Sequence, residues 1–414
     1  MQWARQIEWF LIAAVWSIFA SGSFAQAPPA KQKTSNAGEN IAETLTIGLF
    51  NTLLFFDHVF MRPATAISPD YLQRISKPSS NHYRDYVEYR SGRIDRAELV
   101  RRLPHIAMIG DSLSKNFYIS SPASMLWRAR TERQRDWFLD TDTSPQSINS
   151  LYERLARVTP LVATEYSTSG AVVAPTSAEP FTRRLARTRY FQDQVAQIKK
   201  ARRFPDVILI WIGHNNTNWA DGLSETERKN PAPHLQSIVK KFRADYTEGL
   251  TELVDEARKQ DHRVALVVFG LADFETFFQM REKAANLHAS NPELFPYYPA
   301  TCRYFEALKL ENREVTTRLG QMLNTELKDI VAAFNRNSKI DSNVRLEYSD
   351  ALSKIDLHDV RGFNRNDAWH PSIIGHNVLA YTAFKAVRPS LRFIGIDGKS
   401  DRATRDRFAQ KLAR

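Results

Sequence analysis

Three residue types that together activate a hydroxyl group occur at well-marked positions in this sequence. Ser112 lies in the stretch IGDSLS, directly after an apolar run, and Asp367 and His370 stand three residues apart in NDAWHPS. A serine hydroxyl is a poor nucleophile until an imidazole accepts its proton and a carboxylate fixes the tautomer of that imidazole. We therefore expect Ser112 as nucleophile, His370 as base and Asp367 as the orienting acid.

Two further stretches supply hydrogen-bond donors for a developing oxyanion. Gly170 lies in STSGAVV, where a backbone N–H without a neighbouring side chain can approach a ligand closely, and Asn215 lies in WIGHNNTNW. Each such donor typically contributes about 3 kcal/mol to stabilising a tetrahedral intermediate. We expect the N–H groups of Ser112 and Gly170 and the side-chain amide of Asn215 to form an oxyanion hole.

Each of these residues, taken alone, also has an ordinary structural interpretation. A serine after a strand commonly caps a turn, glycine and asparagine are typical turn residues, and an Asp-x-x-His pair commonly makes a hydrogen bond at a helix entry. Their joint occurrence, each after an expected strand or before the last expected helix, favours the catalytic interpretation.

The elements that would position these residues alternate along the chain from about residue 104. Long helical stretches, including residues 183–203 and 235–259, separate the apolar runs IAMIG, LVATEYS, DVILIWIG, RVALVVFG and VRLEYS. Apolar runs without strict alternation are typical of a parallel sheet that helices cover on both faces. Catalytic groups of such sheets collect beyond the carboxyl ends of the strands. We expect all the candidate residues at that edge.

These motifs resemble those of the SGNH, or GDSL, hydrolases. IGDSLS matches the first block of that family, Gly170 its second, residues 213–216 (GHNN) its third and residues 367–371 (DAWHP) its fifth. The resemblance covers residues 104–390. It implies a three-layer α/β/α sandwich with a five-stranded, mainly parallel, flavodoxin-like sheet, together with an N-terminal helical extension. It also implies ester hydrolysis.

Two residues of the third block depart from the family pattern. Asn216 stands where the family usually has aspartate, so an amide must hold whatever that carboxylate orients. His214 is unusual beside Asn215. It contacts substrate or serves as a second base in one interpretation, and it is a satisfied loop histidine in the other. Together with Trp369, His214 and Asn216 are candidate substrate contacts.

Other acidic residues near the C-terminus compete for the orienting role. Asp356, His358 and Asp359 lie close upstream of Asp367 and also suggest a metal cluster. A metal site requires converging ligands with defined outer contacts, whereas mixed charge on a loop is more often solvated. We expect no metal and no other cofactor.

Composition limits the partners of the chain. Cys302 is the only cysteine, which excludes an intrachain disulfide and zinc sites built from several thiolates. The formal charge of +11 favours contact with an anionic membrane or envelope surface. No basic run is interleaved with aromatic residues as in a nucleic-acid module, so nucleic acid is not an expected partner.

The N-terminus predicts export. The apolar residues 9–20 follow Arg5, and SGSFA then presents small residues at cleavage-site spacing, which indicates a signal peptide or, alternatively, an uncleaved anchor. Export without disulfides suggests a bacterial periplasm, cell envelope or secreted location. The expected divisions are a signal peptide (1–25), a linker (26–40), a helical and loop extension with an amphipathic helix at 41–62 (41–100), the hydrolase domain (101–395) and a basic tail (396–414).

Three functions remain open at this point. The first is an exported serine esterase or lipase that hydrolyses a carboxylic ester of a lipid or small molecule through an acyl-enzyme. The second is a carbohydrate O-acetyl esterase or O-acetyltransferase acting on an envelope polysaccharide. The third is a non-catalytic binding protein on a hydrolase fold, against which the intact triad weighs.

Two segments inside the hydrolase domain bear on the substrate. The aromatic residues between 274 and 305 would line an acyl or sugar pocket, act as a lid, or simply pack into the core. The basic stretch 120–138 would meet an anionic surface or form a solvated face. The sequence leaves these alternatives open.

Overall fold

The chain divides into two compact units, Met1–Thr52 and Leu53–Arg414. The computed structural model describes residues of the second unit: 63–67, 83–115, 136–140, 148–173, 190–220, 223–295, 298, 306–336, 342–355, 359–364 and 367–396. The expectations for the signal peptide, the linker, the helix at 41–62, most of 120–138, Cys302, Asp356, His358 and the C-terminal tail fall outside these residues.

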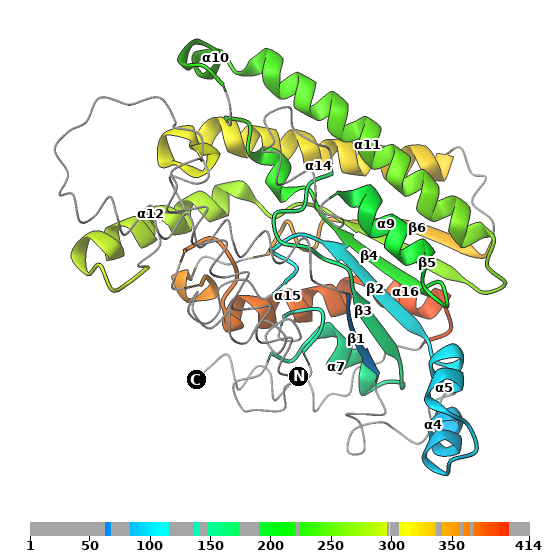
Figure 1. Ribbon diagram of the computed structural model, residues 1–414. Coiled ribbons are helices and arrows are strands. Elements are labelled where there is room, and N and C mark those ends of the chain that lie inside the picture. Colours follow the sequence, from blue (N-terminus) through cyan, green and yellow to red (C-terminus); the bar gives the residue numbers. More distant parts are fainter. Residues whose placement is uncertain are drawn as a thin grey trace, which may run out of the picture. The chain divides into compact units, whose positions relative to one another are not determined.

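A six-stranded mixed sheet organises the second unit, with strand order β1-β3-β2-β4-β5-β6 (Figure 1). Strands β2 to β6 run parallel to one another, and β1 pairs antiparallel with β3. The strands are β1 (Ala64–Ile67), β2 (His105–Gly110), β3 (Val162–Glu165), β4 (Val207–Trp211), β5 (Val264–Phe269) and β6 (Val344–Ser349).

The sheet has one strand more than the sequence predicts. All five expected strands are present, and the sixth, β1, comes from the segment assigned to the N-terminal extension. Ala64 pairs with Glu165 and Ile67 with Val162. A four-residue run such as ATAI is too short to distinguish a strand from a loop by its pattern, and only the pairing with β3 defines it.

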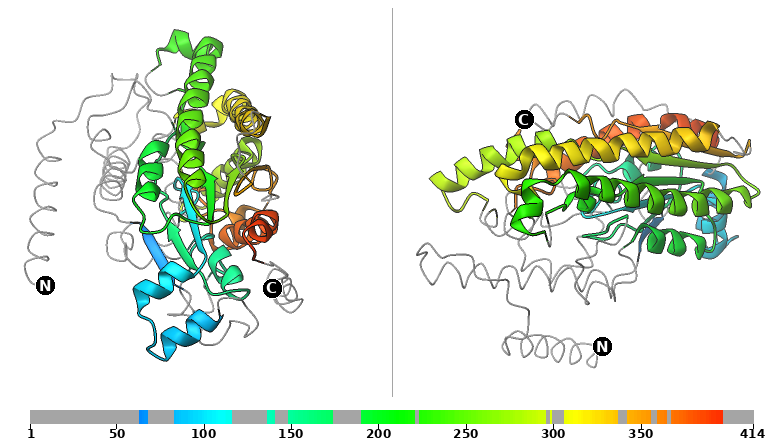
Figure 2. Two further views of the ribbon diagram at one scale, coloured as in Figure 1. Left: turned by 90° about the vertical axis from the view of Figure 1, so that its right-hand side faces the viewer. Right: turned by 90° about the horizontal axis from the view of Figure 1, so that it is seen from above.

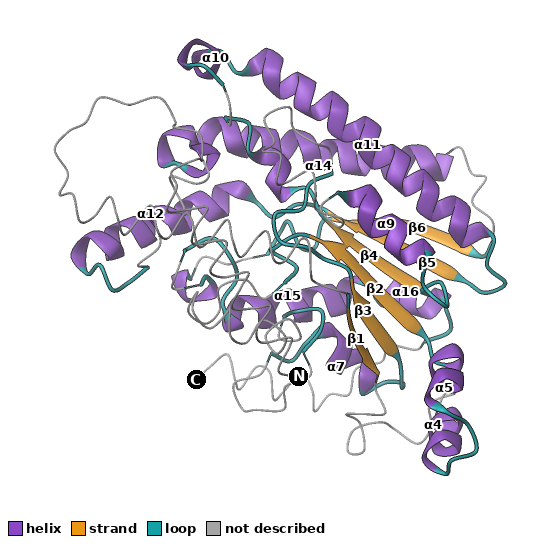
Figure 3. Cartoon of the chain, viewed as in Figure 1, coloured by secondary structure: helices purple, strands orange, loops and turns teal. Residues whose placement is uncertain are grey.

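Helices cover both faces of the sheet (Figures 2 and 3). On one face α9 (Phe191–Lys199) contacts β2 and packs against α11 (Ala232–Arg258), which in turn contacts α14 (Arg313–Arg336). On the other face α16 (Arg388–Phe393) contacts β5 and packs beside α15 (Ile373–Ala386), which contacts α7 (Leu151–Ala156). This arrangement is the three-layer sandwich that the sequence predicts.

The remaining described elements lie before β2 or in the connections. They are α4 (Tyr83–Arg90), α5 (Arg96–Arg102), α10 (Glu225–Lys229), α12 (Phe274–Ser290) and the short 3₁₀ turns η1 (His214–Thr217), η2 (Glu306–Leu308), η3 (Leu310–Asn312) and η4 (Val360–Gly362). None of the helices in the described ranges is long and apolar enough to cross a membrane.

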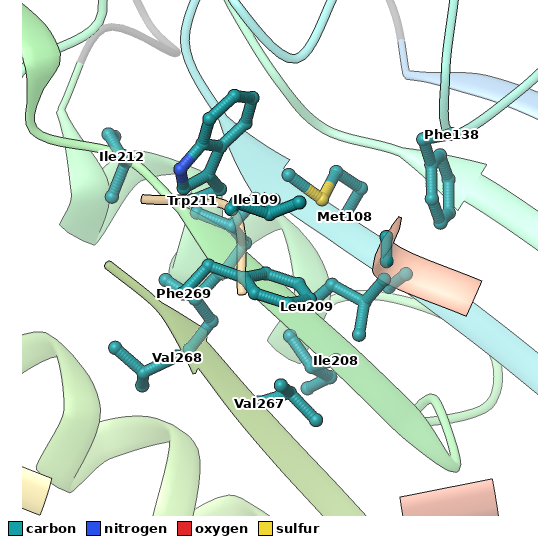
Figure 4. Close-up of a cluster of buried hydrophobic side chains, with 14 of the residues drawn as sticks. Met108, Ile109, Phe138, Ile208, Leu209, Trp211, Ile212, Val267, Val268 and Phe269 are labelled. Atoms are coloured by element: carbon teal, nitrogen blue, oxygen red, sulfur yellow. The ribbon is translucent and has the colours of Figure 1, made fainter. Parts of the chain in front are cut away.

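The central strands are buried along their whole length, which explains their uninterrupted apolar sequences. Figure 4 shows side chains of β2, β4 and β5 packed together, among them Ile109, Leu209 and Val268. Phe138 packs in the same cluster, and Trp137 is also fully buried, so the described end of the stretch 120–138 is core rather than solvated surface. Burial of each such side chain contributes about 1.5–3 kcal/mol, which makes the sheet a rigid support for its edge loops.

Candidate active site

Strand β2 ends in a tight turn that carries Ser112. The side chain of Gln194 makes hydrogen bonds with both the N–H and the carbonyl of Gly110. The Gly110 N–H donates to Gln194 Oε1 (3.0 Å), and the Gly110 carbonyl accepts from Gln194 Nε2 (2.9 Å). A Cβ atom at position 110 would clash with Ser114 and lie 2.8 Å from Ser167 Oγ, so the turn requires glycine there. Ser112 follows two residues later and is 6% exposed.

Asp111, the residue before the candidate nucleophile, is fully buried and accepts three hydrogen bonds. Its Oδ1 accepts from the N–H of Leu113 (3.0 Å). Its Oδ2 accepts from the backbone N–H of His214 (3.3 Å) and from His214 Nδ1 (2.8 Å). Three donors compensate the desolvation of this carboxylate. The last two bonds join the turn after β2 to the loop after β4.

The second ring nitrogen of His214 reaches a third loop. Nε2 accepts a hydrogen bond from the backbone N–H of Ala272, which follows β5 (3.1 Å). Because Nε2 accepts and Nδ1 donates to a carboxylate, we assign a neutral imidazole with its proton on Nδ1. The buried ring also packs edge-on against Trp211, with centroids 4.8 Å apart. Both ring nitrogens are therefore engaged by the protein itself.

A glycine sets the path of the loop that carries His214. Gly213 has φ +127°, and a Cβ atom there would lie 2.9 Å from Phe242 Cε2 on α11. Its carbonyl accepts from the N–H of Asn216 (3.0 Å), which closes the turn leading into η1. Only glycine combines this backbone conformation with this close approach.

Asn215 and Asn216 hold the loop that follows β3. Asn215 Nδ2 donates to the carbonyl of Ala171 (2.9 Å), and Asn216 Oδ1 accepts from the N–H of Val173 (2.8 Å). Gly170 directly precedes this pair of contacts and has φ +69°. The amide of Asn216 thus supplies the oxygen acceptor that the family's usual aspartate would supply, which explains how the loop accommodates the departure.

Asp367 and His370 come together in the loop before α15. His370 Nδ1 donates to Asp367 Oδ2 (2.5 Å), and Asp367 Oδ1 accepts from the backbone N–H groups of Trp369 (3.0 Å) and His370 (3.1 Å). Both side chains are buried. A carboxylate on Nδ1 fixes the tautomer that leaves Nε2 as the basic nitrogen. The structure therefore places the two candidate residues in direct contact, with the Asp367 carboxylate on Nδ1 of His370.

Trp369 is packed by helix α12. Its ring centroid lies 4.5 Å from that of Phe277 and 5.9 Å from that of Phe274, and Phe274 lies 6.5 Å from the ring of His214. Phe274, Phe277 and Phe278 are all buried. The aromatic side chains of α12 therefore belong to the core. Their contacts run from the loop that carries Asp367 and His370, called here the histidine loop, to the loop after β4.

Asp359, the other candidate for the orienting acid that the structure describes, makes its contacts with Arg361. Asp359 pairs with Arg361 at the surface, and the Arg361 guanidinium holds the pKa of that carboxyl below its usual value. No cluster of three or more His, Cys, Asp or Glu side chains in the described ranges is arranged to hold a metal ion. Asp367 is the carboxylate that contacts His370.

Several residues of this edge were not singled out from the sequence. Asp111 lies inside the quoted motif, but its role depends on His214, which is 103 residues away. Gln194 lies on α9 and carries no signal other than its position on an expected helix. Ala272 acts only through its backbone, which no sequence pattern could reveal.

Comparison with known families decides the class to which this site belongs. The family model of the GDSL-like lipases and acylhydrolases matches residues 106–382. The chain belongs to this family. The matched residues of the GDSL-like domain run from β2 into α15 and include Ser112, Asn215, Asp367 and His370. The chain is accordingly an ester hydrolase of the acylhydrolase type.

Two solved structures resemble this GDSL-like chain at low sequence identity. One is an inhibitor-bound aryl esterase of M. smegmatis, with 15% identity and a TM-score of 0.35 over 70% of this chain and 100% of that one. Another has 10% identity and a TM-score of 0.40 over 70% of this chain and 99% of that one. No curated protein matches the chain.

Proposed function

We propose that the protein is an exported serine esterase or lipase that hydrolyses a carboxylic ester through Ser112, His370 and Asp367. The observation that carries the proposal is the 2.5 Å hydrogen bond from His370 Nδ1 to the buried Asp367, within a family match that includes Ser112. That bond prepares an imidazole for proton transfer at its other nitrogen.

The reaction then proceeds in two steps, acylation of Ser112 and hydrolysis of the acyl-enzyme. His370 Nε2 takes the proton of Ser112 as the hydroxyl oxygen attacks the ester carbonyl carbon. The tetrahedral intermediate collapses, the C–O bond to the alcohol breaks, and the imidazolium returns the proton to the departing alkoxide. Water attacks the acyl-enzyme in the same way, which releases the carboxylic acid and restores the serine.

The oxyanion of each intermediate is assigned to three donors. They are the N–H groups of Ser112 and Gly170 and the side-chain amide of Asn215. One N–H of the Asn215 amide nitrogen donates to Ala171, and the second is available for the oxyanion. The contacts of Asn215 and Asn216 to the loop after β3 support this assignment because they attach two of the three donors to each other.

Export and the natural substrate complete the proposal. The apolar residues 9–20 support passage through a membrane, and the charge of +11 supports work at an anionic membrane or envelope surface. Comparing the turnover of p-nitrophenyl acetate with that of p-nitrophenyl octanoate shows which acyl chain length the enzyme accepts. Hydrolysis of the acetyl ester alone would favour the alternative, an O-acetyl esterase or O-acetyltransferase on an envelope polysaccharide.

The first prediction tests the nucleophile. Ser112→Ala is expected to abolish labelling by a fluorophosphonate probe and to lower kcat by roughly 10⁶, because serine and histidine act as a unit. Ser114→Ala is the matched control, since Ser114 is a buried serine of the same turn, and it is expected to remain labelled. Circular dichroism confirms that both variants fold. A folded Ser112→Ala protein that still reacts with the probe would remove this serine from the mechanism.

A further inference from the structure

His214 is the residue at which the separate loops of this edge meet. Its backbone N–H and its Nδ1–H both donate to Asp111 Oδ2, and its Nε2 accepts from the N–H of Ala272. It therefore contacts the turn that bears Ser112 and the loop after β5, and it directly precedes Asn215 in the chain.

We propose that His214 is a positioning residue whose neutral imidazole holds the nucleophile Ser112 and the oxyanion donor Asn215 at a fixed separation. The inference rests on the proposed function, because it assigns those two residues their catalytic roles. His214 acts through its neighbours: Asp111 precedes Ser112, and Asn215 follows His214. The two-point attachment to Asp111 thus ties two catalytic residues through one carboxylate oxygen.

The imidazole ring suits this task because it donates and accepts at once. The Nδ1–H satisfies a fully buried carboxylate, and Nε2 satisfies a backbone N–H. An asparagine amide can place a donor near the position of Nδ1, and a glutamine amide can place an acceptor near that of Nε2, but neither side chain reaches both positions. A substitution therefore separates the two bonds.

The packing of the ring extends the same role to the histidine loop. The His214 ring lies edge-on against Trp211 at 4.8 Å and 6.5 Å from Phe274, whose ring contacts Trp369. Trp369 stands between the candidate acid and base in the sequence. The hydrogen bonds of His214 attach it to the loops after β2 and β5, and its ring contact with Phe274 links it to the loop that carries Asp367 and His370.

The consequence is a specific effect on turnover. Misplacement of a reacting group by about 1 Å costs on the order of 10²-fold in rate, whereas ground-state binding depends less on that alignment. Loss of the His214 bonds therefore lowers kcat much more than it changes KM. A merely structural histidine would lower stability and leave the kcat of the folded protein unchanged.

The second prediction tests this role in full-length protein with p-nitrophenyl acetate. His214→Phe keeps a ring but loses both side-chain hydrogen bonds, and kcat is expected to fall by about 10–10²-fold with KM changed by less than about threefold. His214→Asn, which keeps a donor for Asp111, is expected to recover most of this loss. His214→Gln, which keeps only an acceptor for Ala272, is expected to recover little.

The matched control is a buried histidine at the start of β2, the strand whose other end leads into the turn of Ser112. His105 begins β2 and bonds Thr164 Oγ1 through Nε2 (2.9 Å), far along the strand from Ser112. His105→Phe is expected to retain the kcat of the folded protein. A His214→Phe kcat within about twofold of wild type, or an equal loss in His105→Phe, would overturn the proposal. If His214→Phe fails to fold, equal kcat values for His214→Asn and His214→Gln overturn it.

A measurement without turnover separates this inference from the proposed function. Nitrogen-15 NMR of histidine-labelled protein near neutral pH is expected to show a neutral imidazole protonated on Nδ1, whose signals disappear in His214→Asn. A cationic ring or the opposite tautomer would refute the positioning role whether or not the protein is active. Wild-type protein that shows the expected tautomer yet neither hydrolyses esters nor reacts with a fluorophosphonate would instead refute the proposed function.

Discussion

At the scale of single residues, the histidine loop depends on a strained backbone. Ala368, between Asp367 and Trp369, has φ +54°, a left-handed conformation that costs a non-glycine residue about 1–2 kcal/mol. This conformation accompanies the turn in which Asp367 accepts from two backbone N–H groups and reaches the ring of His370. The strain therefore coincides with the turn that brings Asp367 to His370.

The third prediction concerns this position. A β-branched residue is a genuine outlier at positive φ, so Ala368→Val is expected to destabilise the protein by about 2 kcal/mol or more and to lower kcat as the loop shifts. Ala368→Gly relieves the backbone strain and is expected to keep kcat within about threefold of wild type, because glycine adopts this conformation freely. Thermal unfolding and ester turnover measure both effects. Equal activity of the two variants would show that the backbone at 368 does not control the acid–base pair.

At the scale of elements, helix α12 packs against the loop that carries Asp367 and His370. The Phe277 ring lies tilted against Trp369 at 4.5 Å and edge-on to Phe363 at 5.3 Å, so one ring contacts the loop at two positions before His370. The helix is capped by Asp273, whose carboxylate accepts from the N–H groups of Glu275 and Thr276. This cap fixes where the helix starts and hence which face meets the loop.

The fourth prediction tests that support. Phe277→Leu is expected to lower stability by about 1–2 kcal/mol and kcat by about tenfold, because the loop loses its ring contact. Phe278→Leu is the matched control on the same helix: Phe278 is equally buried but takes no part in the Trp369 ring contacts seen among the described residues. It is expected to lose comparable stability and to keep its kcat. Similar kcat losses in both variants would assign α12 a general structural role only.

At the scale of the whole molecule, buried ionisable groups make stability depend on pH. Asp136 is fully buried, its Oδ1 accepts from the N–H groups of Phe138 and Leu139 (2.8 Å each), and burial together with the neighbouring Glu165 raises its pKa well above 3.8. The folded protein therefore holds a proton that the unfolded chain releases, and stability falls as pH rises above about 4.

A buried histidine acts in the opposite direction. The N–H of Trp137 donates to His376 Nδ1 (3.2 Å), and burial lowers the pKa of His376 to about 3, with the nearby His370 adding to the effect. The unfolded chain takes up a proton below its ordinary value of 6.5, and the folded protein does not. The stability that neutral His376 contributes is therefore lost as pH falls from 6.5 towards 3.

The fifth prediction isolates the acidic pair. Asp136→Asn keeps the oxygen that accepts two N–H groups and supplies an N–H donor for Glu165 without binding a proton. Relative to wild type it is expected to gain stability as pH rises from about 4, by up to about 1.4 kcal/mol per pH unit. Urea unfolding at about pH 5, 6.5 and 8 measures the slope. Asp359→Asn is the control, because the pKa of that exposed carboxyl is lowered, and no such gain is expected. A difference independent of pH would show that Asp136 is ionised in the folded protein.

The sequence by itself determined the layers of the fold, the family and the position of the candidate motifs. Strands such as VILIW are legible because a strand buried on both faces must be apolar throughout, and this property is local. The contact between Asp367 and His370 was predictable for the same reason, since three residues at a helix entry are enough to make it. The catalytic roles of Ser112, His370, Asp367, Gly170 and Asn215 remain predictions.

Only the tertiary structure decided how the loops are joined. The pairing of β1 with β3, the hydrogen bond between Asp111 and His214, the ring contact of Phe277 with Trp369 and the raised pKa of Asp136 all link segments that are distant along the chain. Such contacts leave no periodic trace in the sequence. They arise when packing of the sheet and helices brings the strand ends together and excludes water. Without water, each buried hydrogen bond and charge has a larger effect on the free energy of the folded protein.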